Sequence, residues 1–121
     1  MGNFNSFEEI IAWQKARLFN KRIYEITNKE SFKKDFELVK QIRRASISIS
    51  SNIAEGFERN TDKEFIYFLY IAKASSAEVR SQLYLAFDLE YISNDEFEEL
   101  LKNITDISKL ISGLIKYLSK S

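Results

Sequence analysis

The absence of proline is the feature that most constrains what this chain can fold into. Proline interrupts a helix because it lacks a backbone N–H and its ring clashes with the preceding turn, and none occurs in the 121 residues. Glycine, the next strongest interruption, occurs only as Gly2, Gly56 and Gly113. We therefore expect long helices joined by short turns.

Three segments carry the S/T-x-x-E pattern of a capping box, in which the two side chains satisfy free N–H groups of a first helical turn. They are SFEE at Ser6, TDKE at Thr61 and SNDE at Ser93, and each precedes an apolar periodic run. A fourth start is expected near Lys34 and Asp35. The sequence predicts helices over roughly 7–28, 35–56, 62–91 and 94–118.

The lengths of these helices and of their connections predict the topology. Helices of about 22 residues or more are about 33 Å long, and short turns between them force consecutive helices to run antiparallel. We expect a single all-α domain over residues 1–121, folded as an antiparallel up-down-up-down four-helix bundle.

One stretch has two possible periods. From Ser46 to Ser50 serine and isoleucine alternate, which is typical of a half-buried strand. In a wider window Val39, Ile42, Ser46, Ile49, Ile53 and Gly56 recur at alternating spacings of three and four, a helical seam. The helix is therefore predicted, with Gly56 in the left-handed position after its last turn.

Small residues are frequent on the second and third predicted helices: Ala45, Ser46, Ser48, Ser50, Ser51 and Ala54, then Ala72, Ala74, Ser75, Ser76 and Ala77. Small facing residues let two helix backbones approach closely, and the hydroxyls can bond back to carbonyls of their own helix. The alternative is that the serines are simply tolerated at the surface.

Composition excludes several classes of function. The chain has neither Cys nor His, which removes disulfides, thiolate and imidazole metal sites and a histidine general base. No Gly-rich phosphate loop or nucleophile elbow is present, so we expect neither an enzyme nor a metal or cofactor. No apolar run approaches the roughly 20 residues of a membrane span, and no signal peptide is visible, which favours a cytoplasmic protein without a membrane partner.

Several segments resemble one known family. The run from Gln41 to Ala45, followed by SISISSNIAEGFER, resembles the pattern Q-L-R-R-A-x-x-S-I-x-x-N-I-A-E-G-x-x-R of the bacterial four helix bundle proteins, also called 23S rRNA-intervening sequence proteins. The segment AWQKARLF near Trp13 resembles the first helix of that family, and AKASSAEVRSQLYLAFDLEYIS resembles its third. The resemblance extends from Phe7 to Ser93.

The resemblance implies a four-helix protomer that assembles into a homopentamer, similar to the accessory variability determinant proteins of diversity-generating retroelements. Those relatives bind nucleic acid and a reverse transcriptase. Members encoded within large-subunit rRNA genes have no established activity. The implied function is that of a non-catalytic scaffold or accessory binding protein with possible nucleic-acid binding. The alternative is a helical module that binds a small molecule or a protein partner and has no affinity for nucleic acid.

A set of polar residues around the family motif is the first candidate site: Arg43, Arg44, Asn52, Glu55, Gly56, Arg59 and Glu78. These groups could form ion pairs that fix the register of packed helices, or a pocket for a ligand or RNA. We expect the structural role. A glutamate near a helix C-terminus is unfavourable, so Glu55 should have a basic partner among Arg43, Arg44 and Arg59.

A basic strip is the second candidate. The chain has 18 basic and 18 acidic residues, yet residues 1–60 carry 11 basic and 8 acidic residues while residues 61–121 carry 7 and 10. The candidate strip for RNA or DNA consists of Lys15, Arg22 and Lys29, which recur every seven residues, followed by Lys33, Lys34 and Lys40. An oligomer would multiply such a strip. The alternative is a solvated charged face.

Second apolar stripes are the third candidate. On the third predicted helix Tyr67, Ile71, Ala74, Leu85 and Leu89 lie away from the core stripe, and on the first helix Ile10, Trp13 and Tyr24 stand apart from Ile11, Leu18, Phe19, Ile23 and Ile26. Contiguous exposed apolar patches usually mark interfaces. We therefore expect a closed homo-oligomer held mainly by the first three helices. The number five comes from the resemblance alone.

Overall fold

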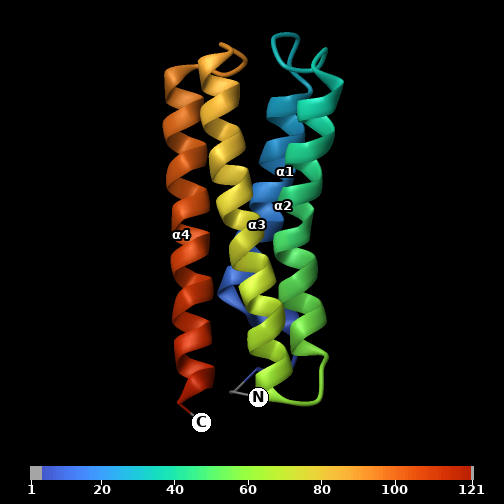
Figure 1. The fold of residues 1–121 in the computed structure, drawn as a ribbon, viewed down its shortest axis with the longest axis vertical. Helices are drawn as coiled ribbons and strands as arrows, with labels where there is room; N and C mark the ends of the chain where they lie inside the picture. The colour runs from blue at the N-terminus through green and yellow to red at the C-terminus, as the bar shows by residue number, and fades with distance from the viewer. Residues whose placement is uncertain (1–3, 121) are drawn as a thin grey trace.

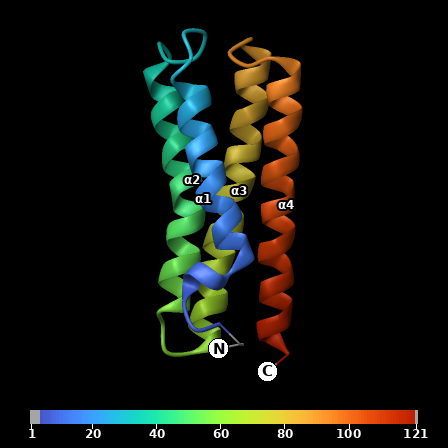
Figure 2. The same cartoon turned by 180° about the vertical axis from the view of Figure 1, so that it is seen from behind.

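The computed structural model describes residues 4–120, which form four long helices and, within that range, no strand. The helices are α1 (Ile11–Thr27), α2 (Phe36–Phe57), α3 (Asp62–Asp88) and α4 (Asn94–Ser119), and a short 3-10 helix, η1 (Phe7–Glu9), precedes α1. Consecutive helices run antiparallel around one core, and both chain ends lie at the same end of the molecule (Figure 1, Figure 2). The predicted all-α four-helix bundle is confirmed.

Three of the four predicted helix starts have a side-chain cap, and those at Thr61 and Ser93 were predicted as caps. The side chains of Asp35, Thr61 and Ser93 each accept a hydrogen bond from the backbone N–H three residues later. Only Ser93 forms the complete capping box, because the side chain of Glu96 also accepts the N–H of Ser93. The cap therefore fixes the first turn of α4 from both sides.

The predicted start of the first helix is wrong. Ser6 makes no capping bond, and the carboxylate of Glu9 instead accepts the backbone N–H of Asn5 at 3.0 Å. The chain forms η1 and an extended residue, Ile10, before α1 begins at Ile11.

This break changes which residues of the first segment face the core. Ile10 is 2% exposed inside the bundle, so its assignment to an oligomer interface is wrong. The helical wheel behind that assignment assumed a continuous helix and does not apply to an extended residue. Ile11 and Leu18, which the same wheel placed inward, are 51% and 68% exposed.

The core confirms the helical period of the serine-isoleucine stretch. Ile42, Ser46, Ile49 and Ile53 are buried and Val39 is half-buried, all within α2. They pack with fully buried side chains of the other helices, among them Ile23, Phe65, Leu69, Leu83, Leu100 and Ile104. A strand would have turned half of these α2 side chains outward.

Gly56 lies inside α2 and not after it. The helix continues to Phe57 with a right-handed cap at Glu58, so the predicted left-handed role of Gly56 is wrong. A Cβ placed on Gly56 would lie 2.7 Å from the Cβ of Phe68 and 3.0 Å from the ring of Phe65. Glycine is therefore required because α3 approaches the backbone of α2 too closely for a side chain.

The serines extend this close approach along α2 and α3, which pack most extensively of the neighbouring helix pairs. Ser75 Oγ donates to Ser48 Oγ at 2.9 Å across the two helices. Ser76 Oγ donates to the carbonyl of Lys73 at 2.6 Å within its own helix. Ser46, Ser50, Ser75 and Ser76 are buried and Ser51 is exposed. Burial between helices, rather than surface tolerance, therefore explains most of these serines: Ser48 and Ser75 face each other across α2 and α3, whereas Ser46 and Ser50 bond to Asn20 of α1.

Helix α3 ends at Asp88, three residues before the predicted end. Glu90 has φ of 62°, and the N–H of Tyr91 bonds to the carbonyl of Ala86 at 2.9 Å, the pattern of a Schellman motif. The hydroxyl of Tyr91 then donates to Asp35 at 2.8 Å. This turn therefore ties the α3–α4 connection to the start of α2.

Two glycine substitutions test the role of Gly56. We expect Gly56→Ala to lower the free energy of unfolding by about 1–3 kcal/mol, the usual cost of overpacking. Gly113 in α4 is the matched control, because a Cβ there meets nothing within 4 Å. Gly113→Ala should raise stability by up to about 1 kcal/mol through helix propensity. Urea denaturation followed by circular dichroism measures both, and equal gains in both variants would contradict the steric role.

Candidate nucleic-acid interface

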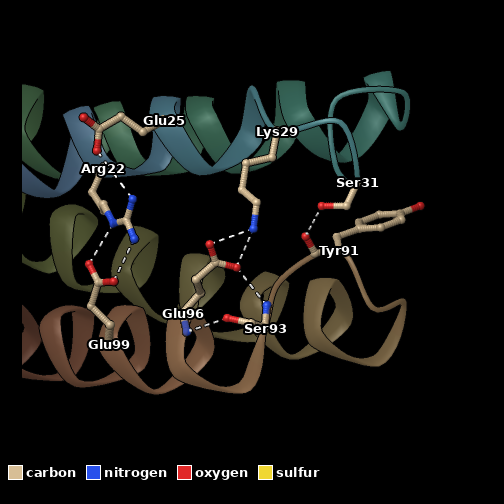
Figure 3. Close-up of polar contacts among 8 residues, drawn as sticks. All are labelled: Arg22, Glu25, Lys29, Ser31, Tyr91, Ser93, Glu96 and Glu99. Carbon is tan, nitrogen blue, oxygen red and sulfur yellow. Dashed lines mark hydrogen bonds and ion pairs between the residues drawn. The ribbon is translucent and has the colours of Figure 1, made fainter.

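Two members of the predicted basic strip are held by acidic residues of α4. Arg22 donates from Nε and from its terminal nitrogen to the two oxygens of Glu99, at 2.8 and 2.9 Å. Lys29 Nζ lies 2.7 Å from both carboxylate oxygens of Glu96 (Figure 3). Both cations are therefore paired within the protomer, and their assignment to nucleic-acid binding stays a prediction.

The pairs shift the acid–base equilibria of the carboxylates. The hydrogen bonds from Arg22 hold the pKa of Glu99 below its usual value, and the same contact raises the pKa of Arg22. Burial alone would raise the pKa of Glu96, but bonds from Lys29 and Ser93 outweigh it and lower that pKa. Glu96 thus serves the capping box and the cross-helix pair together (Figure 3).

The other members of the strip do not gather on one face. Lys33 pairs with Glu30 at 2.6 Å. Lys15 lines a hollow against α4, whereas Lys40 lies on the far side of α2 from the core and Lys34 lies in the α1–α2 connection. Regular spacing in the sequence therefore did not produce a continuous strip.

A different basic surface lies on the sides of α1 and α2 that point away from the core. We call it the basic–aromatic face, and it consists of Trp13, Arg17, Tyr24, Lys40 and Arg43. The guanidinium of Arg43 lies 4.2 Å from the centre of the Tyr24 ring, and that of Arg17 lies 5.9 Å from the Trp13 ring. Arg17 and Lys40 are exposed and Arg43 is half-buried.

A hydrogen bond orients the most enclosed of these cations. Arg43 Nε donates to Thr27 Oγ1 at 2.9 Å, and Thr27 Oγ1 donates in turn to the carbonyl of Ile23 at 2.7 Å. The contact uses Nε, so it leaves the two terminal nitrogens of Arg43 free for an anion.

The acidic residues of α1 and α2 lie outside the centre of the basic–aromatic face. In α1 the single acidic residue, Glu25, lies 3.6 Å from Arg22 on the α4 side. In α2 Glu37 accepts from Gln41 and Glu55 pairs with Arg59. Both lie about 120° around the helix from Arg43 but only about 60° from Lys40, at 100° per residue. The face is therefore positive around Arg17 and Arg43, and Glu37 borders it beside Lys40.

Aromatic and aliphatic groups accompany the charges. Tyr24, Ile47 and Phe36 are exposed beside the basic residues, and Trp13 packs edge-on against Phe7 with ring centres 5.0 Å apart. A hollow of about 400 Å³ adjoins Trp13, Arg17 and Lys21. Exposed rings next to guanidinium groups are the combination that binds unpaired bases and their phosphates.

The polar signature of the family motif does not form one cluster. Asn52 Nδ2 donates to the carbonyl and the hydroxyl of Ser48, at 2.8 and 3.0 Å. Glu55 pairs with Arg59 at 2.9 Å, as expected of one of the three candidate arginines.

The remaining members of that signature lie elsewhere. The guanidinium of Arg59 stacks 4.7 Å from the Phe68 ring. Arg44 and Glu78 are exposed, and Glu78 accepts from Gln82 at 3.4 Å. The side chains are spread along α2 and α3, so they do not enclose a ligand pocket.

Sequence reasoning missed a polar link between α1 and α2. Ser46 Oγ donates to Asn20 Oδ1 at 2.7 Å, and Asn20 Nδ2 donates to Ser50 Oγ at 2.9 Å. The one available signal was Asn20, an amide side chain among the apolar residues of the first predicted helix. Arg17 was also missed, although it follows Trp13 by four residues, the spacing of neighbours on a helix surface.

Residues 4–120 hold neither a candidate metal cluster nor a membrane-spanning helix. In that range no group of three or more Asp or Glu side chains is placed to hold a metal ion. None of its helices combines the length and apolar character that crossing a bilayer requires.

Comparisons with known proteins agree with the fold. The family model described as 23S rRNA-intervening sequence protein matches residues 8–113. The chain is also similar to a crystal structure of a protein with unknown function from the S23 ribosomal protein family of Bacteroides thetaiotaomicron, with 32% sequence identity and a TM-score of 0.81. That similarity covers 88% of this chain and 99% of the other. A search of curated proteins found no match.

The α1–α4 ion pairs predict an acid-sensitive contribution to stability. The pKa values of Glu96 and Glu99 are lowered by folding, so their contribution is present above the unfolded carboxyl pKa of about 4.3 and is lost as pH falls through the folded values. The raised pKa of Arg22 has no effect in this range.

Replacing one carboxylate isolates this contribution. Glu99→Gln should lower the free energy of unfolding at neutral pH by about 0.2–1 kcal/mol, since the pair is partly exposed and screened by solvent. It should also flatten the loss of stability between about pH 5 and 3. Glu98→Gln, at an exposed neighbouring position, is the control. If both variants lost unfolding free energy in the same way between about pH 5 and 3, the assignment would be contradicted.

Proposed function

This chain belongs to the 23S rRNA-intervening sequence protein family, and from that premise we propose that it acts as a non-catalytic, homo-oligomeric scaffold that binds nucleic acid. The observation that carries the proposal is the basic–aromatic face, on which the guanidinium groups of Arg17 and Arg43 lie against aromatic rings. Phosphates would contact Arg17, Lys40 and Arg43.

The aromatic groups favour unpaired bases over a regular duplex. Tyr24 is exposed with a guanidinium already over its ring, and Trp13 is half-buried beside Arg17. Stacking on such rings requires bases outside a helix, which is the usual way in which single-stranded and looped RNA is recognised. We therefore assign Trp13 and Tyr24, first grouped with the oligomer interface, to this face.

Assembly would compensate for the small charge of one protomer. Three cations provide modest affinity at physiological salt, but copies fixed in one oligomer act on the same strand and multiply their affinities. The apolar residues on the outside of α3 support assembly: Tyr67 is 63% exposed, Leu85 and Leu89 are exposed, and Ile71 is half-buried. A pentamer is the number that the family resemblance suggests.

A binding titration tests the nucleic-acid role. Fluorescence anisotropy with a labelled single-stranded RNA and with a duplex DNA, at about 50 and 200 mM salt, should show tighter binding to the RNA and weakening with salt. The double variant Arg17→Gln, Lys40→Gln should reduce affinity at least tenfold and lower the salt slope by about 2 per protomer. Lys116→Gln, at an exposed position of α4 away from the face, is the control for the loss of one positive charge. Absence of wild-type binding at the lower salt would refute the proposal.

Light scattering coupled to size exclusion tests the oligomer. A pentamer of 14.2 kDa chains has a mass of five times that value, about 71 kDa. Ile71→Asp should dissociate it because a carboxylate would be buried without a partner, whereas Glu98→Lys on the outside of α4 should not. A folded wild-type monomer at micromolar concentration would rule out the assembly.

A further inference from the structure

A groove runs along the bundle between α1 and α4. Two adjoining hollows of about 350 and 580 Å³ share Lys15 and Asp106 in their linings, so they form one depression. We call it the α1–α4 groove, and its apolar walls are Ile11 and Leu18 from α1 and Leu110 and Leu114 from α4. Figure 2 shows the side of the molecule on which these two helices lie.

The groove exists because α1 and α4 pack less extensively than any other neighbouring pair. Towards the C-terminus of α1, the long side chains of the Arg22–Glu99 and Lys29–Glu96 pairs join the two helices across the outside of the bundle (Figure 3). Leu18, at 68% exposed, and Ile11, at 51%, therefore have no apolar partner in the protomer that covers them.

An apolar ridge lies on the other side of the bundle. We call it the α3 ridge, and it consists of Tyr67, Ile71, Ala74, Glu78, Leu85 and Leu89, which fall within about 60° of one another at 100° per residue. Tyr84 and Phe87 mark the direction of α4, because both rings pack on Phe97 of that helix. Their ring centres lie 5.1 and 4.5 Å from the centre of the Phe97 ring. The ridge lies about 140° around α3 from them, so it points away from the groove side.

We infer that the α3 ridge of one copy docks in the α1–α4 groove of the next. The inference rests on the proposed homo-oligomer and names its contact. A ridge and a groove on opposite sides of one chain make a heterologous contact, in which each copy offers a different face to each neighbour. Such contacts build a ring when the rotation between copies closes. One contact then covers both unpartnered apolar surfaces, whereas a ridge-to-ridge contact would leave the groove in water.

The heights of the residues along the bundle agree with such a ring. Ser75 of α3 bonds to Ser48 of α2, and Asn20 of α1 bonds to Ser46 and Ser50, which flank Ser48. Asn20 and Ser75 therefore lie at about the same height along the bundle axis. Helices α1 and α3 run in the same direction (Figure 1). Tyr67 therefore lies level with Ala12, and Ile71 with Ala16.

Cyclic symmetry has no shift along its axis, so residues of equal height meet in neighbouring copies. Tyr67 then enters the larger, apolar hollow beside Ile11 and Leu114, whose lining includes Ala12. Ile71 meets the wall between Lys15 and Leu18. The exposed side chain that needs the most room thus faces the larger hollow.

The charges agree with the same register. Glu78 is the one charged member of the ridge, and no basic residue of the described chain pairs with it. By height it lies near Ile23, within about 3 Å along the axis of Lys21. Lys21 lines the smaller hollow, is exposed, and pairs with no acidic residue between positions 4 and 120. A Glu78–Lys21 pair between copies would fix the direction of the ring.

Mixing two interface variants tests the inference. Leu18→Arg blocks the groove and leaves the ridge intact, and Ile71→Asp does the reverse; both positions lie outside the core, so both chains should fold. Each variant alone should be a monomer by light scattering. An equimolar mixture should form a one-to-one heterodimer and nothing larger, because the pair has one intact contact.

Other outcomes separate this inference from the proposed function. If the wild type is oligomeric and Leu18→Arg stays fully assembled, the groove is not the contact, and the inference is wrong while the oligomer stands. If the wild type is a monomer, both are wrong. Glu98→Lys should assemble like the wild type in the same experiment.

Cross-linking supplies a second measurement that does not depend on dissociation. The chain has no cysteine of its own, so introduced thiols are unique. Ile11→Cys and Tyr67→Cys proteins, mixed and allowed to exchange subunits, should form a disulfide-linked dimer on mild oxidation, and neither should do so alone. A dimer in the Tyr67→Cys protein alone would establish a ridge-to-ridge contact and overturn the inference.

Discussion

The close approach of α2 and α3 is the constraint on which the rest of the bundle depends. At Gly56 the two backbones leave no room for a methyl group, and a serine pair continues the contact near the middle of the helices. Four helices of similar thickness cannot all approach equally when one pair is this close. The opposite pair, α1 and α4, is the least packed, and arginine and lysine side chains bridge the separation. The asymmetry explains why one side of the molecule is tightly packed and the other is hollowed.

Much of the fold could be predicted because the signals are local. The absence of proline, the caps at Thr61 and Ser93, and the seam from Ile42 to Ile53 each depend on a few neighbouring residues, and they led to the correct helices and topology. The errors occurred where local patterns compete. Ser6 and Glu9 match a capping box, but Glu9 bonds to Asn5 instead, and the resulting break turned Ile10 inward. A glycine near a helix end suggests a cap, yet at Gly56 the deciding factor was a distant helix.

The candidate site was harder to predict because charge partners come from residues far apart in the sequence. Arg22 and Lys29 recur with Lys15 at a helical period, which suggested one strip. Their partners, Glu99 and Glu96, are more than sixty positions away, and nothing in the first helix indicates them. Arg17 was overlooked because its guanidinium lies near the Trp13 ring, and the two residues join the cations of α2 in one face only once α1 and α2 are packed together. A charge pattern on one helix therefore defines a surface only after the facing helix is known.

Glu96 uses one carboxylate for two contacts, and this couples two processes that are separate in most bundles. Its oxygens accept the N–H of Ser93, which stabilises the first turn of α4, and they also bind Lys29 on α1. Fraying of that turn moves the carboxylate away from Lys29, and separation of the helices removes the charge that steadies the cap. Local opening at this end is consequently cooperative: the helix end and the contact between helices form one unit of partial unfolding.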